Sequence, residues 1–363
     1  MTTRITRSRV SPTLVAPPVA SVPVMLPPGT AVGNYTIERK LAEGGMAVVY
    51  EAVHQILPRR VAVKVMRDAS LGESARTRLL REACLLADLR HRAIVDVHDA
   101  GTLPDGRAWL IMNLVEGPTL GDRLLVRTTL SPAEVVELGL PIAGALACAH
   151  EAGVVHRDLK PENILIVDDP VCPVRVIDWG IAQAARTHEE RLTVDGTITG
   201  TPHYMAPEQI RGELVDGKCD VYALGIVLYE MLAGVPPFNG GMMDIIAHQL
   251  TSAPPPLHLK APSTPVWLTA LISIMLSKDP AQRPTMAQVV STLHGISAKV
   301  RLPGPADEAD EDFIIEMTAD MEEDAVDHEL DELIAELSPS APALVPAKVT
   351  AVPMRRIALG SNG

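Results

Sequence analysis

The chain has 363 residues, of which 47% are hydrophobic and 21% charged, and its formal net charge is -13. That length and apolar content suffice for one large two-lobed domain or for two ordinary domains. The charge is uneven, because residues 1–33 carry three arginines and no acid, whereas residues 297–363 carry five basic and fifteen acidic residues. The part between them is only mildly acidic, so nothing there indicates a nucleic-acid-binding surface.

The two ends of the chain differ from its middle. Several prolines interrupt the apolar stretch within residues 1–33, which favours a basic, disordered arm over a cleaved secretion signal. Residues 297–363 are first acidic and then rich in proline and alanine, as is typical of a solvated, disordered tail. The alternative for the tail is an amphipathic helix that forms on a partner, since Leu330, Leu333, Ile334 and Leu337 fall at helical spacing.

The cysteines and the hydropathy favour a cytoplasmic protein. Cys84, Cys148, Cys172 and Cys219 lie far apart without a C-x-x-C pair, so we expect reduced thiols rather than a metal site or a disulfide framework. No run of eighteen apolar residues occurs, so we expect no membrane-spanning helix.

Strand-like alternation begins after Gly33. It predicts three neighbouring antiparallel strands and then two more that are joined by a turn at 103–106. These strands are expected at 35–37, 47–53, 60–66, 94–98 and 108–112. Between the first two lies Leu41-Ala42-Glu43-Gly44-Gly45-Met46-Ala47, a turn of small residues whose backbone can approach a phosphate closely, although a simple hairpin turn has the same composition.

One predicted helix, at 73–89, carries an acid on its apolar stripe. Leu79, Glu82 and Leu86 lie along one face at offsets of three and four residues. A buried carboxylate needs a partner, because leaving it unpaired is costly. Lys64 on the third strand is one candidate, and the alternative is a solvated face that Glu82 shares with Arg78 or Arg81.

The sequence becomes mainly helical after residue 117. Ser131 and Glu134 form a capping box with Pro132 in the first turn, and this helix is expected to end before Gly153, with Pro141 kinking or splitting it. Further helices are predicted at 220–233, 242–251, 265–276 and 285–295. Strands followed by helices favour two lobes of different class that are joined near 113–117.

A polar loop stands between two apolar runs. His156-Arg157-Asp158-Leu159-Lys160-Pro161-Glu162-Asn163 places an acid, cations and an amide within eight residues. The flanking Val154-Val155 and Ile164–Val167 predict short buried strands. Loops held by a rigid scaffold often carry catalytic residues, so this loop is a candidate active site.

These segments, in this order, resemble the protein kinase signature set. The resemblance rests on the small-residue turn, Val61-Ala62-Val63-Lys64, the polar loop, Asp178-Trp179-Gly180 and the stretch Gly200–Glu208. Residues 35–296 are similar to a bacterial eukaryotic-type (Hanks-type) Ser/Thr protein kinase domain. The resemblance implies an α+β bilobal protein kinase fold: a kinase domain at 34–296, with an N-lobe at about 34–113 and a C-lobe at about 117–296, between the arm at 1–33 and the tail at 297–363.

The resemblance also implies an ATP site. Lys64 would hold the α and β phosphates, and Glu82 would be its ion-pair partner in place of the solvated-face alternative. The remaining nucleotide contacts would come from Leu41, Gly44, Val49, Ala62, Met112, Asn113, Val115 and Leu165. Met112 matches the gatekeeper position. Ala42 and Ala47 replace the first and third glycines of the loop, so weaker or slower nucleotide handling is expected.

For catalysis, the resemblance assigns the substrate hydroxyl proton to Asp158 and the γ-phosphate to Lys160. Asn163 and Asp178 would bind Mg²⁺ or Mn²⁺. Trp179 replaces the usual phenylalanine and is expected to pack between His156 and Leu86.

The acceptor is indicated by a different set of residues. Lys160 and the stretch Gly200–Glu208 resemble the Ser/Thr-kinase form, in which Thr201 bridges Asp158 and Lys160. Glu208 would pair with Arg283, and Asp220 would cap the catalytic loop. The implied substrates are Ser/Thr hydroxyls of proteins, since a small-molecule kinase is not expected to carry this docking stretch.

Arg157 offers a basic pocket for a phosphate on the loop 178–208. Thr193, Thr197 and Thr199 are the candidate autophosphorylation sites, with Thr193 first by family position, and the alternative is a threonine-rich mobile loop without a switch. The expected function is that of an ATP-dependent, non-specific serine/threonine protein kinase whose input comes through a partner or another kinase. The alternative is a pseudokinase scaffold, which only the two alanines and Trp179 support.

Overall fold

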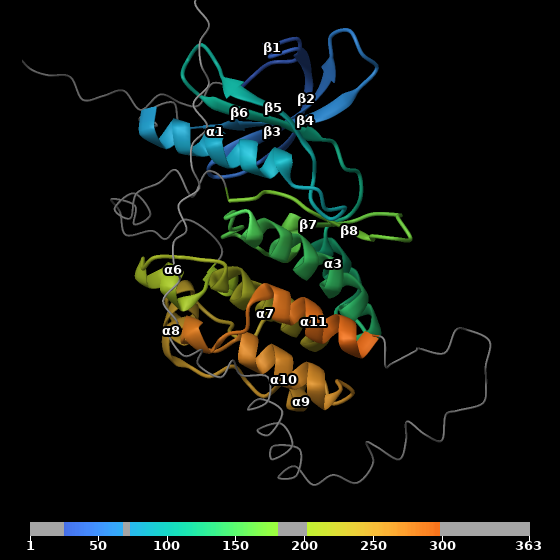
Figure 1. The fold of residues 1–363 in the computed structure, drawn as a ribbon, viewed down its shortest axis with the longest axis vertical. Helices are drawn as coiled ribbons and strands as arrows, with labels where there is room; N and C mark the ends of the chain where they lie inside the picture. The colour runs from blue at the N-terminus through green and yellow to red at the C-terminus, as the bar shows by residue number, and fades with distance from the viewer. Residues whose placement is uncertain (1–24, 68–72, 181–201, 298–363) are drawn as a thin grey trace, which may run out of the picture. The chain divides into compact units, whose positions relative to one another are not determined.

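Six strands form an antiparallel sheet in the order β1-β2-β3-β4-β6-β5. The computed structural model describes residues 25–67, 73–180 and 202–297 (Figure 1). The strands are β1 (Ala31–Val32), β2 (Tyr35–Glu43), β3 (Ala47–His54), β4 (Arg60–Met66), β5 (Val97–Thr102) and β6 (Ala108–Asn113). The prediction of three neighbouring antiparallel strands is therefore confirmed, and the fourth predicted strand is shifted to begin at residue 97 and end at 102.

Side chains alternate between the two faces of each strand, which gathers apolar residues on one face of the sheet. Ile37, Tyr50, Val61, Val63 and Ile111 are buried in one apolar cluster on this sheet. In the register of β4, Lys64 lies between Val49 of β3 and Leu110 of β6. The sheet thus holds the Lys64 side chain at a defined position between apolar residues of β4.

A single long helix, α1 (Glu73–Asp88), packs against β5. Leu79, Ala83 and Leu86 are buried, as the predicted stripe requires. Glu82 is partly buried, with its side chain 20% exposed. The helix therefore carries its acid at the edge of the apolar face.

A two-stranded hairpin follows the polar loop. It is formed by β7 (Ile164–Ile166) and β8 (Val174–Val176), with η1 (Pro161–Asn163) directly before it. The prediction of a strand at 154–155 is wrong, since these two residues lie outside any strand. Val154 is held instead by a backbone bond from its N–H to the carbonyl of Ala149, at 2.9 Å, just after the helix end.

The chain divides into two compact units, one within Met1–Asp122 and Cys148–Gly200, the other within Arg123–Ala147 and Thr201–Gly363. The helices of the remaining chain are α2 (Leu120–Arg127), α3 (Pro132–Glu151), α6 (Pro207–Arg211), α7 (Lys218–Ala233), α8 (Met242–Thr251), α9 (Leu257–Lys260), α10 (Val266–Met275) and α11 (Met286–Ser297), with two short 3-10 helices, η2 (Pro202–Tyr204) and η3 (Pro280–Gln282). In the second unit α7 is buried along nearly its whole length and packs against α10. The four later helices that the sequence predicts are thus confirmed, whereas α2 and the short helices were not anticipated.

The long helix α3 begins as its capping box predicts. The hydroxyl of Ser131 accepts from the N–H of Glu134, and the carboxylate of Glu134 accepts from the N–H of Ser131. Gly153 lies in the left-handed region, at φ 77°. The predicted split at Pro141 is wrong, because one helix continues through it. Among the described residues α3 is the one helix long and apolar enough to cross a membrane by length and composition, a test that core helices also pass, and 44% of its apolar window is buried.

Candidate active site

The polar loop is organised around the carboxylate of Asp158. Lys160 Nζ donates to Asp158 Oδ2 at 3.1 Å. The side-chain amide of Asn163 donates to the carbonyl of Asp158 at 2.7 Å and to its Oδ2 at 3.3 Å. The Asp158 side chain is 31% exposed, so its carboxylate is held by two neighbours and still reaches solvent.

The β7–β8 hairpin places the two predicted metal ligands, Asn163 and Asp178, at the same one of its ends. Ile164 pairs with Val176 across β7 and β8, and the N–H of Ile177 donates to the carbonyl of Asn163 at 2.9 Å. Asp178 follows Ile177 directly. Two residues fifteen positions apart in sequence therefore leave the same end of one hairpin.

The segment Asp178-Trp179-Gly180 is fixed against His156. His156 Nε2 bonds the carbonyl of Ile177 at 3.1 Å, and the N–H of Gly180 donates to the carbonyl of His156 at 2.9 Å. The Trp179 ring lies 4.9 Å from the His156 ring, and its indole N–H donates to the carbonyl of Val176. Trp179 is buried, so its predicted packing against His156 is confirmed, and both Trp179 and Leu86 line the same pocket.

Two residues of this region have left-handed backbones. Arg157 has φ 66° and Asp178 has φ 57°. Non-glycine residues rarely adopt this conformation, and when they do they are concentrated at functional sites. The strain here falls on the two residues whose side chains enter the ion pairs described next.

The predicted ion pair between Lys64 and Glu82 is not formed between these two described residues. Lys64 Nζ lies 3.1 Å from Asp178 Oδ1, and Glu82 Oε1 lies 3.2 Å from Arg157 Nη1. The predicted pair is absent because Lys64 is neutralised by Asp178 and Glu82 by Arg157. Burial raises the pKa of Glu82, and the charge of Arg157 only partly offsets that rise.

An apolar pocket opens beside Lys64 and Asp178. It is lined by α1, by β4 to β6 and by the Asp178 segment: Lys64, Met66, Leu79, Leu86, Val95, Val97, Leu110, Met112, Ile177, Asp178 and Trp179. Of the predicted nucleotide contacts, Lys64 and Met112 line it. Ala62 lies beside Met112 in the β4–β6 register, Val49 beside Lys64, and Leu165 bridges to Thr119.

Asn113, Gly44 and Leu41 are three further predicted nucleotide contacts, and each has different surroundings. The Asn113 side chain bonds His98 Nε2 at 2.6 Å and donates to Asp96 at 2.9 Å. The N–H of Gly44 donates to the carbonyl of Ala47 at 2.9 Å, which closes the turn between β2 and β3. Leu41 is exposed. Sequence reasoning missed the polar partners of Asn113, for which spacing offers no signal.

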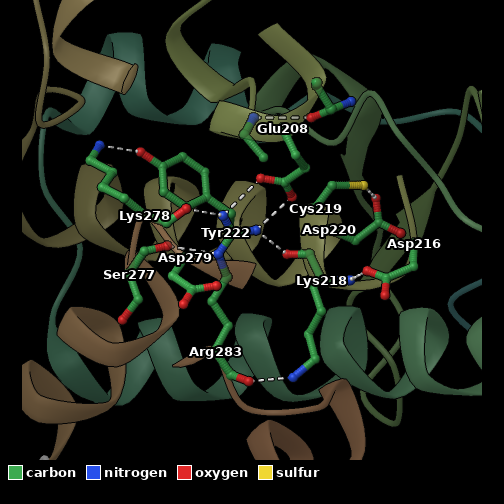
Figure 2. A network of polar contacts seen from close by, with 12 residues as sticks. Glu208, Asp216, Lys218, Cys219, Asp220, Tyr222, Ser277, Lys278, Asp279 and Arg283 are labelled. Atoms are coloured by element: carbon green, nitrogen blue, oxygen red, sulfur yellow. Dashed lines mark hydrogen bonds and ion pairs between the residues drawn. The ribbon is translucent and has the colours of Figure 1, made fainter. Parts of the chain in front are cut away.

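The second unit holds a buried ion pair (Figure 2). Arg283 donates to both carboxylate oxygens of Glu208, at 2.7 and 2.8 Å, and its other N–H groups reach the carbonyls of Ser277, Lys218 and Lys278. Arg283 is 0% exposed and Glu208 4%. The predicted pair of these two residues is confirmed.

Some predicted residues lie outside the described part of the chain. These are Thr193, Thr197, Thr199 and Thr201, together with most of the arm at 1–33 and of the tail at 297–363. Asp220, expected to cap the catalytic loop, is fully buried and accepts from the thiol of Cys219.

Comparison with known proteins agrees with this geometry. The sequence matches the protein kinase domain family over residues 35–294. The serine/threonine-protein kinase PknL of Mycobacterium tuberculosis is 38% identical over 274 residues, which cover 74% of this chain and 67% of PknL. PknE of the same organism is 37% identical over 256 residues, 70% of this chain and 44% of PknE.

Solved structures give the same result. The crystal structure of the PknI kinase domain (C20A mutant) of Mycobacterium tuberculosis aligns with a TM-score of 0.59 at 28% identity, covering 75% of this chain and 99% of that domain. Rad53 1-466 in complex with AMP-PNP aligns with a TM-score of 0.59 at 26% identity, covering 71% and 64%. The chain belongs to the protein kinase family, among the bacterial Hanks-type serine/threonine kinases, with the bilobal α+β fold of that family.

Proposed function

We propose that this chain transfers the γ-phosphate of ATP to serine and threonine hydroxyls of proteins, with Asp158 at the reacting centre. The observation that carries the proposal is the arrangement around Asp158, whose carboxylate is oriented by Asn163 and neutralised by Lys160 while still reaching solvent. A carboxylate so placed can accept the proton of an incoming hydroxyl and orient its oxygen. The ammonium of Lys160 can then meet the charge that develops on the phosphoryl oxygens.

Lys64 is the proposed anchor of the α and β phosphates. It projects from β4 next to Asp178 and is only 13% exposed. Low exposure strengthens its attraction to a phosphate, because less water screens the charge. The turn at Gly44 and the apolar residues Val49, Ala62, Met112 and Leu165 are proposed to hold the rest of the nucleotide, with Leu41 and the backbone at 113–115 (Asn113 to Val115).

Asn163 and Asp178 fit a divalent cation. The amide nitrogen of Asn163 is committed to Asp158, which leaves its carbonyl oxygen as the ligand atom, and Asp178 supplies a carboxylate. Mg²⁺ characteristically takes one or two protein oxygens and completes its shell with phosphates and water, so two ligands suffice. When bound, Mg²⁺ or Mn²⁺ would neutralise the phosphate charge and align the donor. No group of three His, Cys, Asp or Glu in the described chain is placed to hold a metal by itself.

The ion pairs describe a resting arrangement of the proposed enzyme. Asp178 cannot serve a cation fully while it neutralises Lys64, and Glu82 cannot support Lys64 while it pairs with Arg157. Activation therefore requires both pairs to exchange. A phosphate on Thr193, Thr197 or Thr199 would compete with Glu82 for Arg157, which gives autophosphorylation a direct route to that exchange.

The proposed enzyme acts in the cytoplasm. Four free cysteines, among them the exposed Cys84, suit a reducing cytoplasm. The protein substrates carry Ser or Thr acceptors, and the acidic tail is the proposed contact for a further protein partner.

The test is the transfer of labelled γ-phosphate from ATP and magnesium to a generic basic protein. Asp158→Asn is expected to lower the rate about a hundredfold or more, roughly 3 kcal/mol, as for loss of one properly placed transition-state group. Asp168→Asn makes the same chemical change at an exposed residue after β7 and should leave the rate unchanged. Equal incorporation by wild type and Asp158→Asn would reject catalysis and favour the pseudokinase scaffold.

A further inference from the structure

The backbone at the start of η2 is held by a buried glutamine. Gln249 of α8 is 0% exposed, and its Nε2 donates to the carbonyl of Pro202 at 3.2 Å and to that of His203 at 2.5 Å. Both acceptors belong to residues 202–208, the described part of the stretch that the kinase resemblance implies is the peptide-docking segment. A side chain from a different helix therefore supplies the donor for two successive carbonyls of that segment.

The orientation of Gln249 is itself determined by a neighbour. Tyr222 of α7 donates its hydroxyl to Gln249 Oε1 at 2.5 Å, and Lys278 Nζ donates to that hydroxyl at 2.8 Å. Because Oε1 is occupied by a donor, the amide nitrogen must face Pro202 and His203. Figure 2 shows Lys278 reaching the Tyr222 hydroxyl and the same tyrosine beside Arg283.

The two ends of the docking segment are thus fixed by separate contacts. Gln249 holds the carbonyls of residues 202 and 203, and Arg283 holds the carboxylate of Glu208 five residues later. The rings and cations are packed together, since Arg283 lies 4.8 Å and Lys278 5.2 Å from the centre of the Tyr222 ring. Hydrogen bonds in such a buried network are costly to leave unmade, so the segment has one favoured position.

We propose that Gln249 is a positioning residue for the protein acceptor: through Tyr222 and Lys278 it holds the Pro202–His203 backbone where a Ser- or Thr-containing peptide binds. This inference rests on the proposed kinase function. It assigns a role in acceptor recognition to α8, which carries none of the residues around Asp158. Gln249 itself does not touch the reacting atoms.

The test separates acceptor binding from nucleotide chemistry. Gln249→Glu keeps the size of the side chain and its acceptor for Tyr222 but replaces the donor with an oxygen that faces two carbonyls. Loss of a buried hydrogen bond of this kind corresponds to about a tenfold effect or more. We therefore expect KM for a peptide acceptor to rise about tenfold, while KM for ATP and the slow hydrolysis of ATP in the absence of acceptor stay at the wild-type level. Tyr222→Phe should raise the peptide KM in the same direction by a smaller factor.

The matched control is Asn239→Asp. The amide of Asn239 also donates to a proline carbonyl, that of Pro236 at 2.7 Å, but it lies exposed before α8. This variant should leave both KM values unchanged. A peptide KM within twofold of wild type for Gln249→Glu would overturn the inference, and so would a fall in ATP hydrolysis equal to the fall in peptide phosphorylation, since that would make Gln249 a residue of general structure.

Hydrogen exchange supplies a readout that does not depend on activity. Gln249→Glu is expected to speed the exchange of backbone amides in residues 203–208 and to leave those of α11 unchanged, whereas unchanged exchange at 203–208 would reject the positioning role. Failure of the proposed kinase function would give a different result. Wild type and Asp158→Asn would then transfer phosphate equally, whichever residue stands at position 249.

Discussion

The carboxylate of Glu82 meets the guanidinium of Arg157 at 3.2 Å, across seventy-five residues of sequence. Both side chains are largely shielded from water, with 20% and 17% of their surfaces exposed. Water and salt screen a pair in such surroundings less than they screen a surface pair, although burial of the Glu82 carboxylate costs more than the charge of Arg157 returns. The same arginine is the proposed receptor of an activation-loop phosphate, so one cation has two mutually exclusive partners.

Replacing Arg157 by methionine should uncouple activity from phosphorylation. In the dephosphorylated protein the substitution frees Glu82, so kcat/KM should rise, and phosphorylation should then add little. For the wild type we expect phosphorylation to raise kcat/KM about tenfold or more, in keeping with a charge-assisted coupling of 1–3 kcal/mol. The measurement is kcat/KM before and after phosphatase treatment.

The control for that experiment is Arg90→Met, which removes an exposed arginine whose contact is with the carbonyl of Ala87. It should behave as wild type in both states. Equal activation of Arg157→Met and wild type by phosphorylation would show that Arg157 is not the shared partner.

The buried pair of Glu208 and Arg283 should dominate the stability of the second unit. Arg283→Met leaves the Glu208 carboxylate buried without its bidentate partner, and breaking a buried pair typically costs about 3–5 kcal/mol. Arg211→Met is the matched control, because its partner Glu213 lies 3.9 Å away and both side chains are more than 40% exposed. Urea unfolding followed by circular dichroism measures the difference, and similar midpoints for the two variants would contradict it.

Sequence periodicity predicted the regular elements well, for physical reasons that particular residues illustrate. The strand at β4 alternates around Lys64 and was predicted at its observed bounds, and α8 was predicted at 242–251 as observed. The strand predicted at Val154-Val155 is absent, because two β-branched residues form a strand only when a neighbouring strand pairs with them. Of the two outcomes predicted for Pro141, a split does not occur, because the surrounding helix tolerates one missing N–H donor.

The sequence identified the residues of the candidate site, but it did not predict which of their side chains pair with one another. The resemblance located Lys64, Glu82, Asp158, Asn163 and Asp178 from motif order. It could not tell which cation Glu82 would meet, because Lys64 and Arg157 are both available and the choice depends on the position of α1. Gln249 carried no signal, since a lone glutamine in an apolar helix has no distinctive spacing.

Gly180 should tolerate no side chain. A Cβ at this position would lie 2.3 Å from the carbonyl oxygen of His156, which is backbone and cannot move aside alone. Gly180→Ala is therefore expected to displace Asp178, and misplacement of about 1 Å at a reacting centre can cost roughly a hundredfold in rate. Gly295→Ala in α11 meets no atom within 4 Å and serves as the control. Phosphate transfer near the wild-type rate by Gly180→Ala would contradict the geometry.

The start of α3 should lose stability in acid through Glu134. Burial raises the pKa of this carboxyl, but hydrogen bonds from Arg127 and Ser131 outweigh it and lower the pKa from 4.5 to about 2. A depressed pKa means that the ionised carboxylate stabilises the folded state above pH 4.5, and that this contribution is lost as the pH falls from 4.5 towards 2. Glu134→Gln should cost about 1 kcal/mol at neutral pH, because Gln keeps an acceptor for the N–H of Ser131 but loses the charge that pairs with Arg127. It should also flatten the dependence of the unfolding free energy on pH within that window.

Glu137→Gln, at an exposed position of the same helix, isolates the effect of the cap. Urea unfolding of the three proteins between pH 7 and 3 should show the Glu134→Gln curve approaching wild type as the pH falls, because the wild type loses in acid what the variant already lacks. Parallel curves for Glu134→Gln and wild type across the range would mean that the carboxylate at the cap does not stabilise α3 through its charge.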